Sequence, residues 1–194
     1  MRLFGRTNRE SERDLVLRRM PRKAVCAEIG VFAGDFSARI LTLARPRRLH
    51  LIDPWKFESG PTYERAVYGG VNIEGQPAMD ALHDTVRERF DREIHSGNVI
   101  VHRSAAAEVA AEFADEYFDW VYIDANHQYE FVLLDLESYY PKVKPGGFLA
   151  GDDYGVEGWW HGGVTRAVQE FAGRGGCEKL VVRGDQFVLR KKGR

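Results

Sequence analysis

Three acidic residues follow two short apolar runs in the middle of the chain. Asp124 follows the run Trp120–Ile123, and Asp152 and Asp153 follow the run Phe148–Ala150. Apolar residues between the runs recur at helical spacing, which predicts strand, helix and strand with the two strands parallel. The carboxyl ends of parallel strands lie at one sheet edge, where open α/β folds bind ligands. Carboxylates gathered there repel one another unless a cation separates them, which favours Mg²⁺ or another divalent ion.

A simpler role is open to each of these aspartates, because Asp often caps the helix or turn that follows a strand. Capping is the better interpretation of one isolated Asp. Two acidic clusters at the ends of two neighbouring strands favour a metal site instead. The sequence therefore predicts Asp124, Asp152 and Asp153 as metal ligands.

A glycine-containing turn follows the first apolar run of the chain. Glu28 precedes Gly30 and Gly34, and two glycines four residues apart permit a tight strand-to-helix turn that a ligand can approach closely. The triple glycine of dinucleotide-binding proteins is missing, which argues against an NAD-dependent dehydrogenase. The next run, Leu49–Ile52, ends in Asp53, where doubly wound folds place an acid that binds ribose hydroxyls. A plain Asp-Pro turn is the alternative.

Further strands are predicted at Asn98–Val101 and in a closing hairpin, Leu180–Arg183 with Gln186–Arg190. Strands and helices alternate from residue 24 onward, which predicts an α/β fold. We expect residues 24–194 to form a single Rossmann-like domain. Its sheet would be mostly parallel and seven-stranded, with a C-terminal antiparallel hairpin and helices on both faces. Residues 1–23 are rich in arginine and predict a basic segment, helical and solvated, on the edge of the domain.

Two long connections lie at the predicted ligand-binding edge. Residues 54–77 combine glycines with aromatic side chains and lack clear periodicity, so we expect a lid there. The second connection, Tyr154–Gly163, contains Trp159, Trp160 and His161. By contrast, Lys144–Gly147 has the residues of a type II turn.

The composition excludes several classes of partner. The chain has 44% hydrophobic and 29% charged residues and a net charge of −1, so neither nucleic acid nor an anionic membrane is an expected partner. No apolar run approaches membrane-spanning length. Two cysteines without metal or redox spacing indicate a reducing, cytoplasmic location.

Taken together, these motifs resemble those of class I S-adenosylmethionine-dependent methyltransferases. The stretches Tyr122–Tyr129, Lys144–Gly147 and Gly151–Tyr154 are similar to the metal-dependent small-molecule O-methyltransferases of the macrocin and aminocoumarin type. They resemble the catechol and caffeoyl-CoA type more distantly. The resemblance covers the chain from Ala24 to Arg190.

The resemblance implies S-adenosylmethionine as cofactor, with Mg²⁺ or another divalent ion beside it. It places Glu28, Gly30 and Gly34 in the cofactor turn, Ser37 near the methionine carboxylate, Asp53 at the ribose, Ser104 and Ala105 at the adenine, and Asp124, Asp152 and Asp153 at the ion. His127 stands where catechol-type enzymes have a lysine base.

The predicted reaction is methylation of a hydroxyl group on a small-molecule acceptor. The enzyme must align an oxygen with the sulfonium methyl group, and a divalent ion beside Asp124 would lower the pKa of that hydroxyl. A histidine can accept the proton near neutral pH, and both His127 and His161 are candidates.

Two other functions remain open on the same scaffold. One is a metal-dependent oxygenase, similar to cephalosporin-hydroxylase-like relatives, which would need two histidines and one carboxylate around the metal. In that set, His127 would be one of the two histidines and Asp124 would be the carboxylate. The other is a non-catalytic S-adenosylmethionine-binding protein. The acceptor and the oligomeric state, a homo-oligomer included, are left open.

Overall fold

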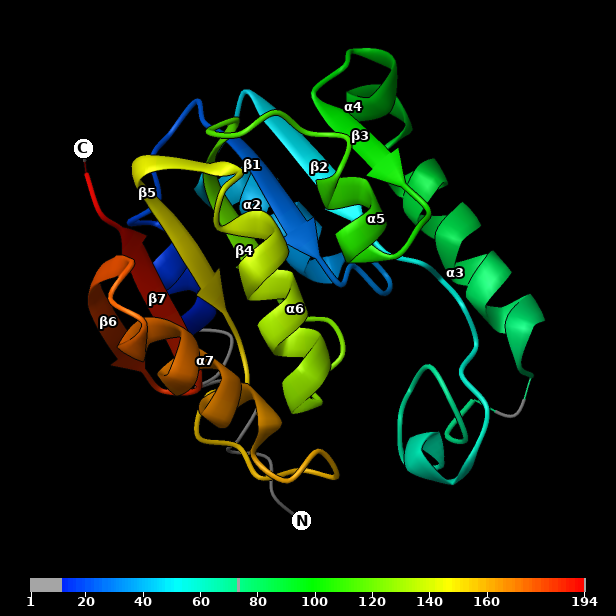
Figure 1. Cartoon of the computed structure of the whole chain (residues 1–194). Coiled ribbons are helices and arrows are strands. Elements are labelled where there is room, and N and C mark those ends of the chain that lie inside the picture. The colour runs from blue at the N-terminus through cyan, green and yellow to red at the C-terminus, as the bar shows by residue number, and fades with distance from the viewer. Residues whose placement is uncertain (1–11, 73, 194) are drawn as a thin grey trace.

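The computed structural model describes residues 12–72 and 74–193, which form one twisted sheet covered by helices (Figure 1). The strands are β1 (Val25–Ile29), β2 (Arg48–Ile52), β3 (Val99–His102), β4 (Phe118–Ile123), β5 (Val143–Gly151), β6 (Cys177–Arg183) and β7 (Gln186–Lys191). Their order in the sheet is β3-β2-β1-β4-β5-β7-β6. Neighbours from β3 to β5 are parallel, and β7 is antiparallel to β5 and β6. The predicted fold class is confirmed.

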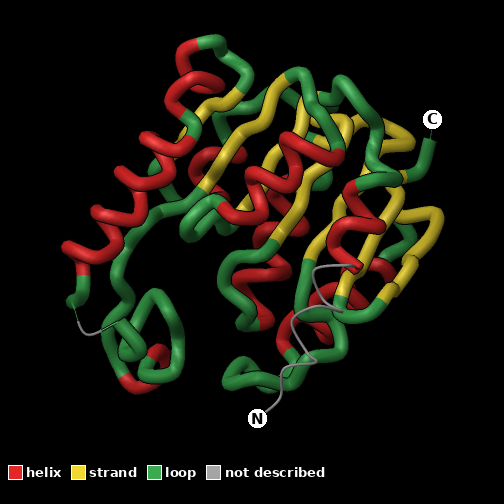
Figure 2. The backbone as a smooth tube through the Cα atoms, turned by 180° about the vertical axis from the view of Figure 1, so that it is seen from behind, coloured by secondary structure: helices red, strands yellow, loops and turns green. Residues whose placement is uncertain are grey.

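Helices cover both faces of the sheet. On the face toward the viewer in Figure 1 lie α5 (Ala106–Ala110), α6 (Tyr129–Tyr139) and α7 (Gly163–Gly173). The other face, seen from behind in Figure 2, packs against α2 (Asp35–Leu43), α3 (Gln76–Arg89) and residues 12–20, of which 12–17 are helical. The short helix α4 (Asp91–His95) links α3 to β3, and one turn of 3-10 helix, η1 (Pro61–Tyr63), lies in the predicted lid.

The central strands are buried on both faces, which explains why they are continuous apolar runs rather than alternating ones. In β1 every residue is buried: Val25 and Ala27 contribute to the cluster under α5, α6 and α7, whereas Cys26 contributes to the cluster on the other face. Within the described residues, no helix combines the length and apolar character needed to cross a bilayer.

The predicted turn at Lys144–Gly147 is wrong. These residues belong to β5, which starts at Val143 and runs nine residues to Gly151. Phe118 of β4 pairs with Val143, but Trp120 pairs with Phe148, so extra residues of β5 bulge out between the two pairs. Gly146 has a φ of 75°, and the Pro-Gly-Gly chemistry of a turn serves this irregularity inside the strand instead.

The N-terminal segment is packed more firmly than a solvated helix on the domain edge. Its first eleven residues lie outside the described residues. In the part that is described, Val16, Leu17 and Met20 are buried in the core. On the same segment, Asp14 accepts two hydrogen bonds from the Arg39 guanidinium of α2.

Asp135 is a buried carboxyl group on the inner face of α6. It is 7% exposed and lies between the buried Val132, Leu136 and Tyr139 of the same helix. Burial raises the pKa of Asp135 to about 7. The folded protein therefore keeps this proton up to about pH 7, whereas the unfolded chain loses it near pH 4.

Replacing Asp135 by Asn should stabilise the protein at pH 8. Because the folded state holds more protons between about pH 4 and 7, the wild-type free energy of unfolding falls as pH rises through that window. Asp135→Asn has no such loss and should be more stable at pH 8 by a few kcal/mol, at about 1.4 kcal/mol per pKa unit, with the gain shrinking toward pH 4. Denaturant unfolding at both pH values measures this, with the exposed Glu130→Gln as control. Equal stability of wild type and variant at pH 8 would contradict it.

Candidate active site

The acidic residues predicted to act together lie at the carboxyl ends of β4 and β5. Ile29 pairs with Ile123, and Ile123 pairs with Gly151, so the ends of β1, β4 and β5 are in register. The strand order reverses between β1 and β4, and crevices form at such reversals in open α/β sheets. Asp124 leaves β4 with its N–H donating to the Ile29 carbonyl at 2.8 Å.

Asp124, His127 and Asp153 form one compact group. Each offers a ligand atom, and these atoms lie within 4.8 Å of one another. His127 Nε2 lies 3.3 Å from Asp124 Oδ1 and 3.2 Å from Asp153 Oδ2. The ring of Trp160 covers the imidazole, with centroids 4.5 Å apart. A divalent ion could be held by these three side chains.

Asp152 contacts Gln186 and Arg13. It is 2% exposed, accepts a hydrogen bond from Gln186 Nε2 and forms an ion pair with Arg13. Gln186 in turn accepts a hydrogen bond from the Tyr122 hydroxyl. The group that the structure brings together thus contains His127 in the place predicted for Asp152.

Arg13 also reaches Asp124, with Nη2 2.7 Å from Oδ2. Asp124 therefore turns one oxygen toward His127 and the other toward Arg13. Sequence reasoning missed both Arg13 and Gln186. A polar residue directly before the apolar run Phe187–Leu189 was an available signal for Gln186, whereas Arg13 is one of many arginines in its segment.

Glu28 and Ser37 meet in the predicted cofactor turn. Ser37 Oγ donates a 2.5 Å hydrogen bond to Glu28 Oε2, and both residues are buried. Burial raises the pKa of Glu28 to about 8, although the bond from Ser37 opposes that shift. Burial therefore favours the protonated form of the Glu28 carboxyl group.

Gly30 and Gly34 have φ values of 86° and 77°, in the region that favours glycine. A Cβ on Gly30 would lie 2.0 Å from the Asp124 carbonyl oxygen. The missing side chain lets the turn after β1 touch the backbone that leaves β4.

Asp53 anchors this turn from the end of β2. Its Oδ2 accepts hydrogen bonds from the N–H groups of Val31 and Phe32, at 2.8 and 3.1 Å, and from the Tyr68 hydroxyl at 2.5 Å. Its Oδ1 accepts one from the Trp55 N–H at 2.7 Å. Burial raises the pKa of Asp53 despite these donors.

Comparison with known proteins identifies the family. A model of the methyltransferase domain matches residues 27–154, more than half of the chain. The structure of the O-methyltransferase NovP is 19% identical over 97% of this chain and 79% of its own, with a TM-score of 0.61. That of an O-methyltransferase from Bacillus cereus in complex with SAH is 17% identical over 94% and 80%, also with a TM-score of 0.61. No curated protein matches the chain.

The chain belongs to the methyltransferase domain family. The predicted class, an S-adenosylmethionine-dependent methyltransferase, is confirmed. At these identities the two solved structures show the shared fold alone.

The predicted lid of the methyltransferase contacts Asp53 after β2 and also the loop after β4. Tyr68 reaches Asp53, as described above. The Tyr63 hydroxyl lies 3.2 Å from Gln128 Oε1 and accepts a bond from Asn126 Nδ2 at 3.3 Å. The Tyr63 ring also meets Trp159 of the second loop, with centroids 5.9 Å apart. Figure 1 shows both loops at the same end of the molecule.

The remaining predicted residues lie apart from the compact group. His161 is exposed on the second loop, with a φ of 49°. Ser104 and Ala105 follow β3, at the same sheet edge as Asp53, and the Ser104 hydroxyl donates to Glu108 Oε2 at 2.5 Å. The described contacts do not join these three residues to the other predicted site residues.

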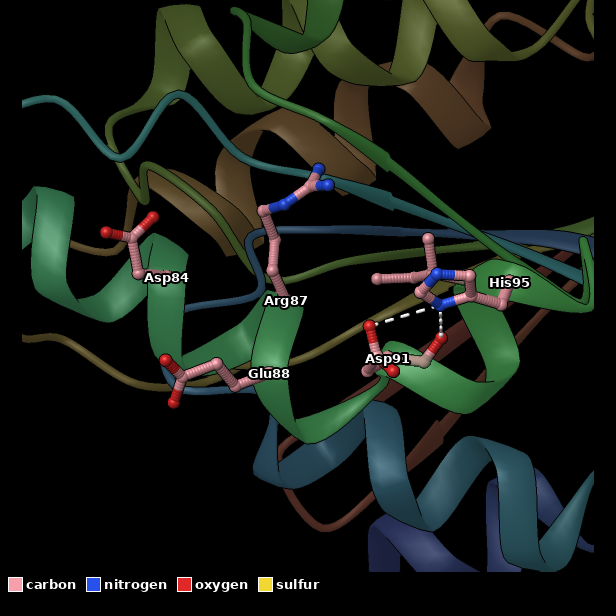
Figure 3. A pocket seen from close by; sticks show the side chains of 6 residues that line it. Asp84, Arg87, Glu88, Asp91 and His95 are labelled. Atoms are coloured by element: carbon pink, nitrogen blue, oxygen red, sulfur yellow. Dashed lines mark hydrogen bonds and ion pairs between the residues drawn. The ribbon is translucent and has the colours of Figure 1, made fainter.

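A separate surface pocket lies on α3 and α4 and contains none of the predicted site residues (Figure 3). Its lining is mostly charged, and the His95–Asp91 pair closes one side, with Nδ1 and Oδ1 3.1 Å apart. Three carboxylates line it together with Arg87, Ile94 and His95, and charged side chains of this kind are typical of a solvated helix surface.

Gly30→Ala should destabilise the methyltransferase far more than Gly175→Ala. Both glycines have nearly the same φ, 86° and 83°, but a Cβ on Gly175 meets nothing within 4 Å. The left-handed conformation alone should cost about 1–2 kcal/mol in either variant. Gly30→Ala must in addition separate β1 from the Asp124 backbone, so we expect a loss several kcal/mol larger or failure to fold. Denaturant unfolding measures the difference, and equal losses would contradict the close approach.

Proposed function

We propose that this methyltransferase transfers the methyl group of S-adenosylmethionine to a hydroxyl group of a small molecule, assisted by a divalent cation at Asp124, His127 and Asp153. The observation that carries the proposal is the gathering of these three side chains beside the Gly30 turn. The two halves of the reaction, cofactor and activated acceptor, would then meet at the reversal of strand order.

The donor set suits the proposed ion. Two carboxylates and one imidazole suit Mn²⁺ or Mg²⁺, with water and acceptor oxygens completing the shell. Asp152 is better placed to hold Arg13 and Gln186 than to bind the ion, so we replace it by His127 in the ligand set. One histidine and two carboxylates also differ from the two-histidine set of an oxygenase.

The residues of the chain would position the acceptor and exclude water. A bound divalent ion would lower the pKa of an acceptor hydroxyl and thereby supply an oxygen nucleophile. The acceptor oxygen would form its bond to the methyl carbon as the carbon–sulfur bond breaks, with S-adenosylhomocysteine as the leaving group. The Trp160 ring contacts His127, and Trp159 contacts both Trp160 and Tyr63, so aromatic side chains lie beside the proposed ion site. When His127 binds the ion, the hydroxyl proton must go elsewhere, and His161 is the other histidine that the sequence predicts as a base.

A metal-independent mechanism is the second candidate, and one observation favours it. His127 Nε2 lies between Asp124 and Asp153, and carboxylates that orient a histidine are typical of a general base. In that case His127 itself would take the proton from the acceptor hydroxyl. The two mechanisms differ in their dependence on a divalent ion.

We also propose a cytoplasmic location for the enzyme. Its two free cysteines support a cytoplasmic setting. The acceptor is the expected partner, with neither nucleic acid nor membrane required.

Asp53→Asn should weaken binding of S-adenosylhomocysteine, whereas Tyr68→Phe should not. The Asp53 carboxylate is proposed to accept hydrogen bonds from the ribose hydroxyls, and losing a charge-assisted hydrogen bond costs about 1.5–3 kcal/mol. Tyr68 donates to the same oxygen and would have to yield to the ribose, so removing its hydroxyl should leave binding unchanged or tighter. Calorimetry measures both variants. Unchanged affinity in Asp53→Asn would remove the ribose assignment.

Asp124→Asn should reduce Mn²⁺ affinity and turnover together while the protein stays folded. The change keeps the shape of the side chain but removes the charge that the ion requires. Asp115→Asn, on an exposed Asp paired with Lys142, is the control and should change neither quantity. Mn²⁺ binding by calorimetry and methyl transfer before and after chelation test this. Full activity after exhaustive chelation would contradict the metal role and favour His127 as base.

A further inference from the structure

The side chain of Arg13, from the N-terminal segment, lies at the junction between the first turn of α2 and the acidic ends of β4 and β5. The Arg13 guanidinium contacts Asp124 and Asp152 on one side. On the other side it lies over the ring of Phe36, 5.0 Å from the centroid. Phe36 is in the first turn of α2 and precedes Ser37, which bonds to Glu28.

Neighbouring contacts of the segment fix this placement. Asp14 is bonded to Arg39 of α2, and Glu12 accepts a 2.5 Å hydrogen bond from Arg183 Nε of β6. Val16 and Leu17 are buried one turn further on. Arg13 is therefore held at the junction by contacts on both sides of it in the sequence.

Asp124 and Asp152 contact only part of the Arg13 guanidinium. Both contacts are made by Nη2, whereas Nε is buried and has no hydrogen-bond partner among the described residues. A guanidinium carries five N–H donors in a rigid fork that matches a carboxylate, and an unpaired buried donor is costly. Donors therefore remain for a further acceptor at this junction.

We propose that Arg13 binds the carboxylate of the amino acid end of S-adenosylmethionine. This inference rests on the proposed function and adds a binding residue from outside the matched family region, residues 27–154. The amino acid end of the donor carries an ammonium and a carboxylate. The carboxylates at the strand ends would repel the carboxylate of the donor unless a positive charge lies between them. Arg13 supplies the opposite charge between those strand ends and the first turn of α2.

The test compares two ligands that differ at this end. S-adenosylhomocysteine carries the carboxylate, whereas 5′-methylthioadenosine keeps the adenosine and the sulfur and lacks the amino acid group. Arg13→Gln should bind S-adenosylhomocysteine at least about tenfold more weakly by calorimetry, as expected for one lost charge-assisted hydrogen bond. Its affinity for 5′-methylthioadenosine should stay within about threefold of wild type.

Two further variants sharpen the test. Arg13→Lys keeps the positive charge but lacks the forked N–H donors of a guanidinium. Its affinity for S-adenosylhomocysteine should therefore lie between those of wild type and Arg13→Gln. Arg18→Gln, exposed on the same segment, should leave both affinities unchanged. Because both ligands are measured on the same folded protein, a general loss of structure in Arg13→Gln would weaken both equally.

Each outcome decides the proposal. A selective loss of S-adenosylhomocysteine binding in Arg13→Gln supports it. Equal losses for both ligands, or no loss for either, would overturn it and leave Arg13 as a clamp on Asp124 and Asp152. Failure of the wild-type protein to bind either ligand would overturn the proposed function itself.

Discussion

The contact between Gly30 and the Asp124 backbone is the constraint on which the rest of the site depends. The Asp124 N–H bonds to the Ile29 carbonyl, and its own carbonyl oxygen occupies the space of a Gly30 side chain. This contact joins the turn after β1 to the end of β4, where the strand order reverses. The turn after β1 lies on one side of this contact, and Asp124 with its acidic neighbours lies on the other.

The buried polar network beside this contact shows how the fold tolerates clustered acids. Asp124 and Asp153 share His127, whereas Asp152 is held by Gln186 and Arg13. Buried carboxylates are costly unless opposite charge and hydrogen bonds accompany them. Here the partners come from a loop, a hairpin strand and the N-terminal segment, so distant parts of the chain are tied to one sheet edge. The same ties give each carboxylate oxygen a defined direction.

Residues 54–77, the predicted lid, contact the same edge of the sheet. Tyr68 shares Asp53 with the backbone of the glycine turn, and Tyr63 meets the loop after β4 and Trp159 of the second loop. A carboxylate has about four acceptor positions, and Asp53 already uses most of them. If Asp53 binds the ribose as proposed, Tyr68 must move, and the position of residues 54–77 would then depend on the cofactor.

The sequence by itself determined the α/β fold class, the glycine turn and the acidic strand ends, because apolar periodicity and strand-end residues are local signals. It misplaced the Lys144–Gly147 turn, since turn residues also suit a bulge when a neighbouring strand supplies hydrogen bonds. Only the tertiary structure decided that His127 rather than Asp152 lies in one compact group with Asp124 and Asp153. It also decided that Asp152 contacts Arg13 and Gln186. Adjacent side chains at a strand end point in different directions, and their partners lie far away in the chain, so no spacing in the sequence encodes the choice.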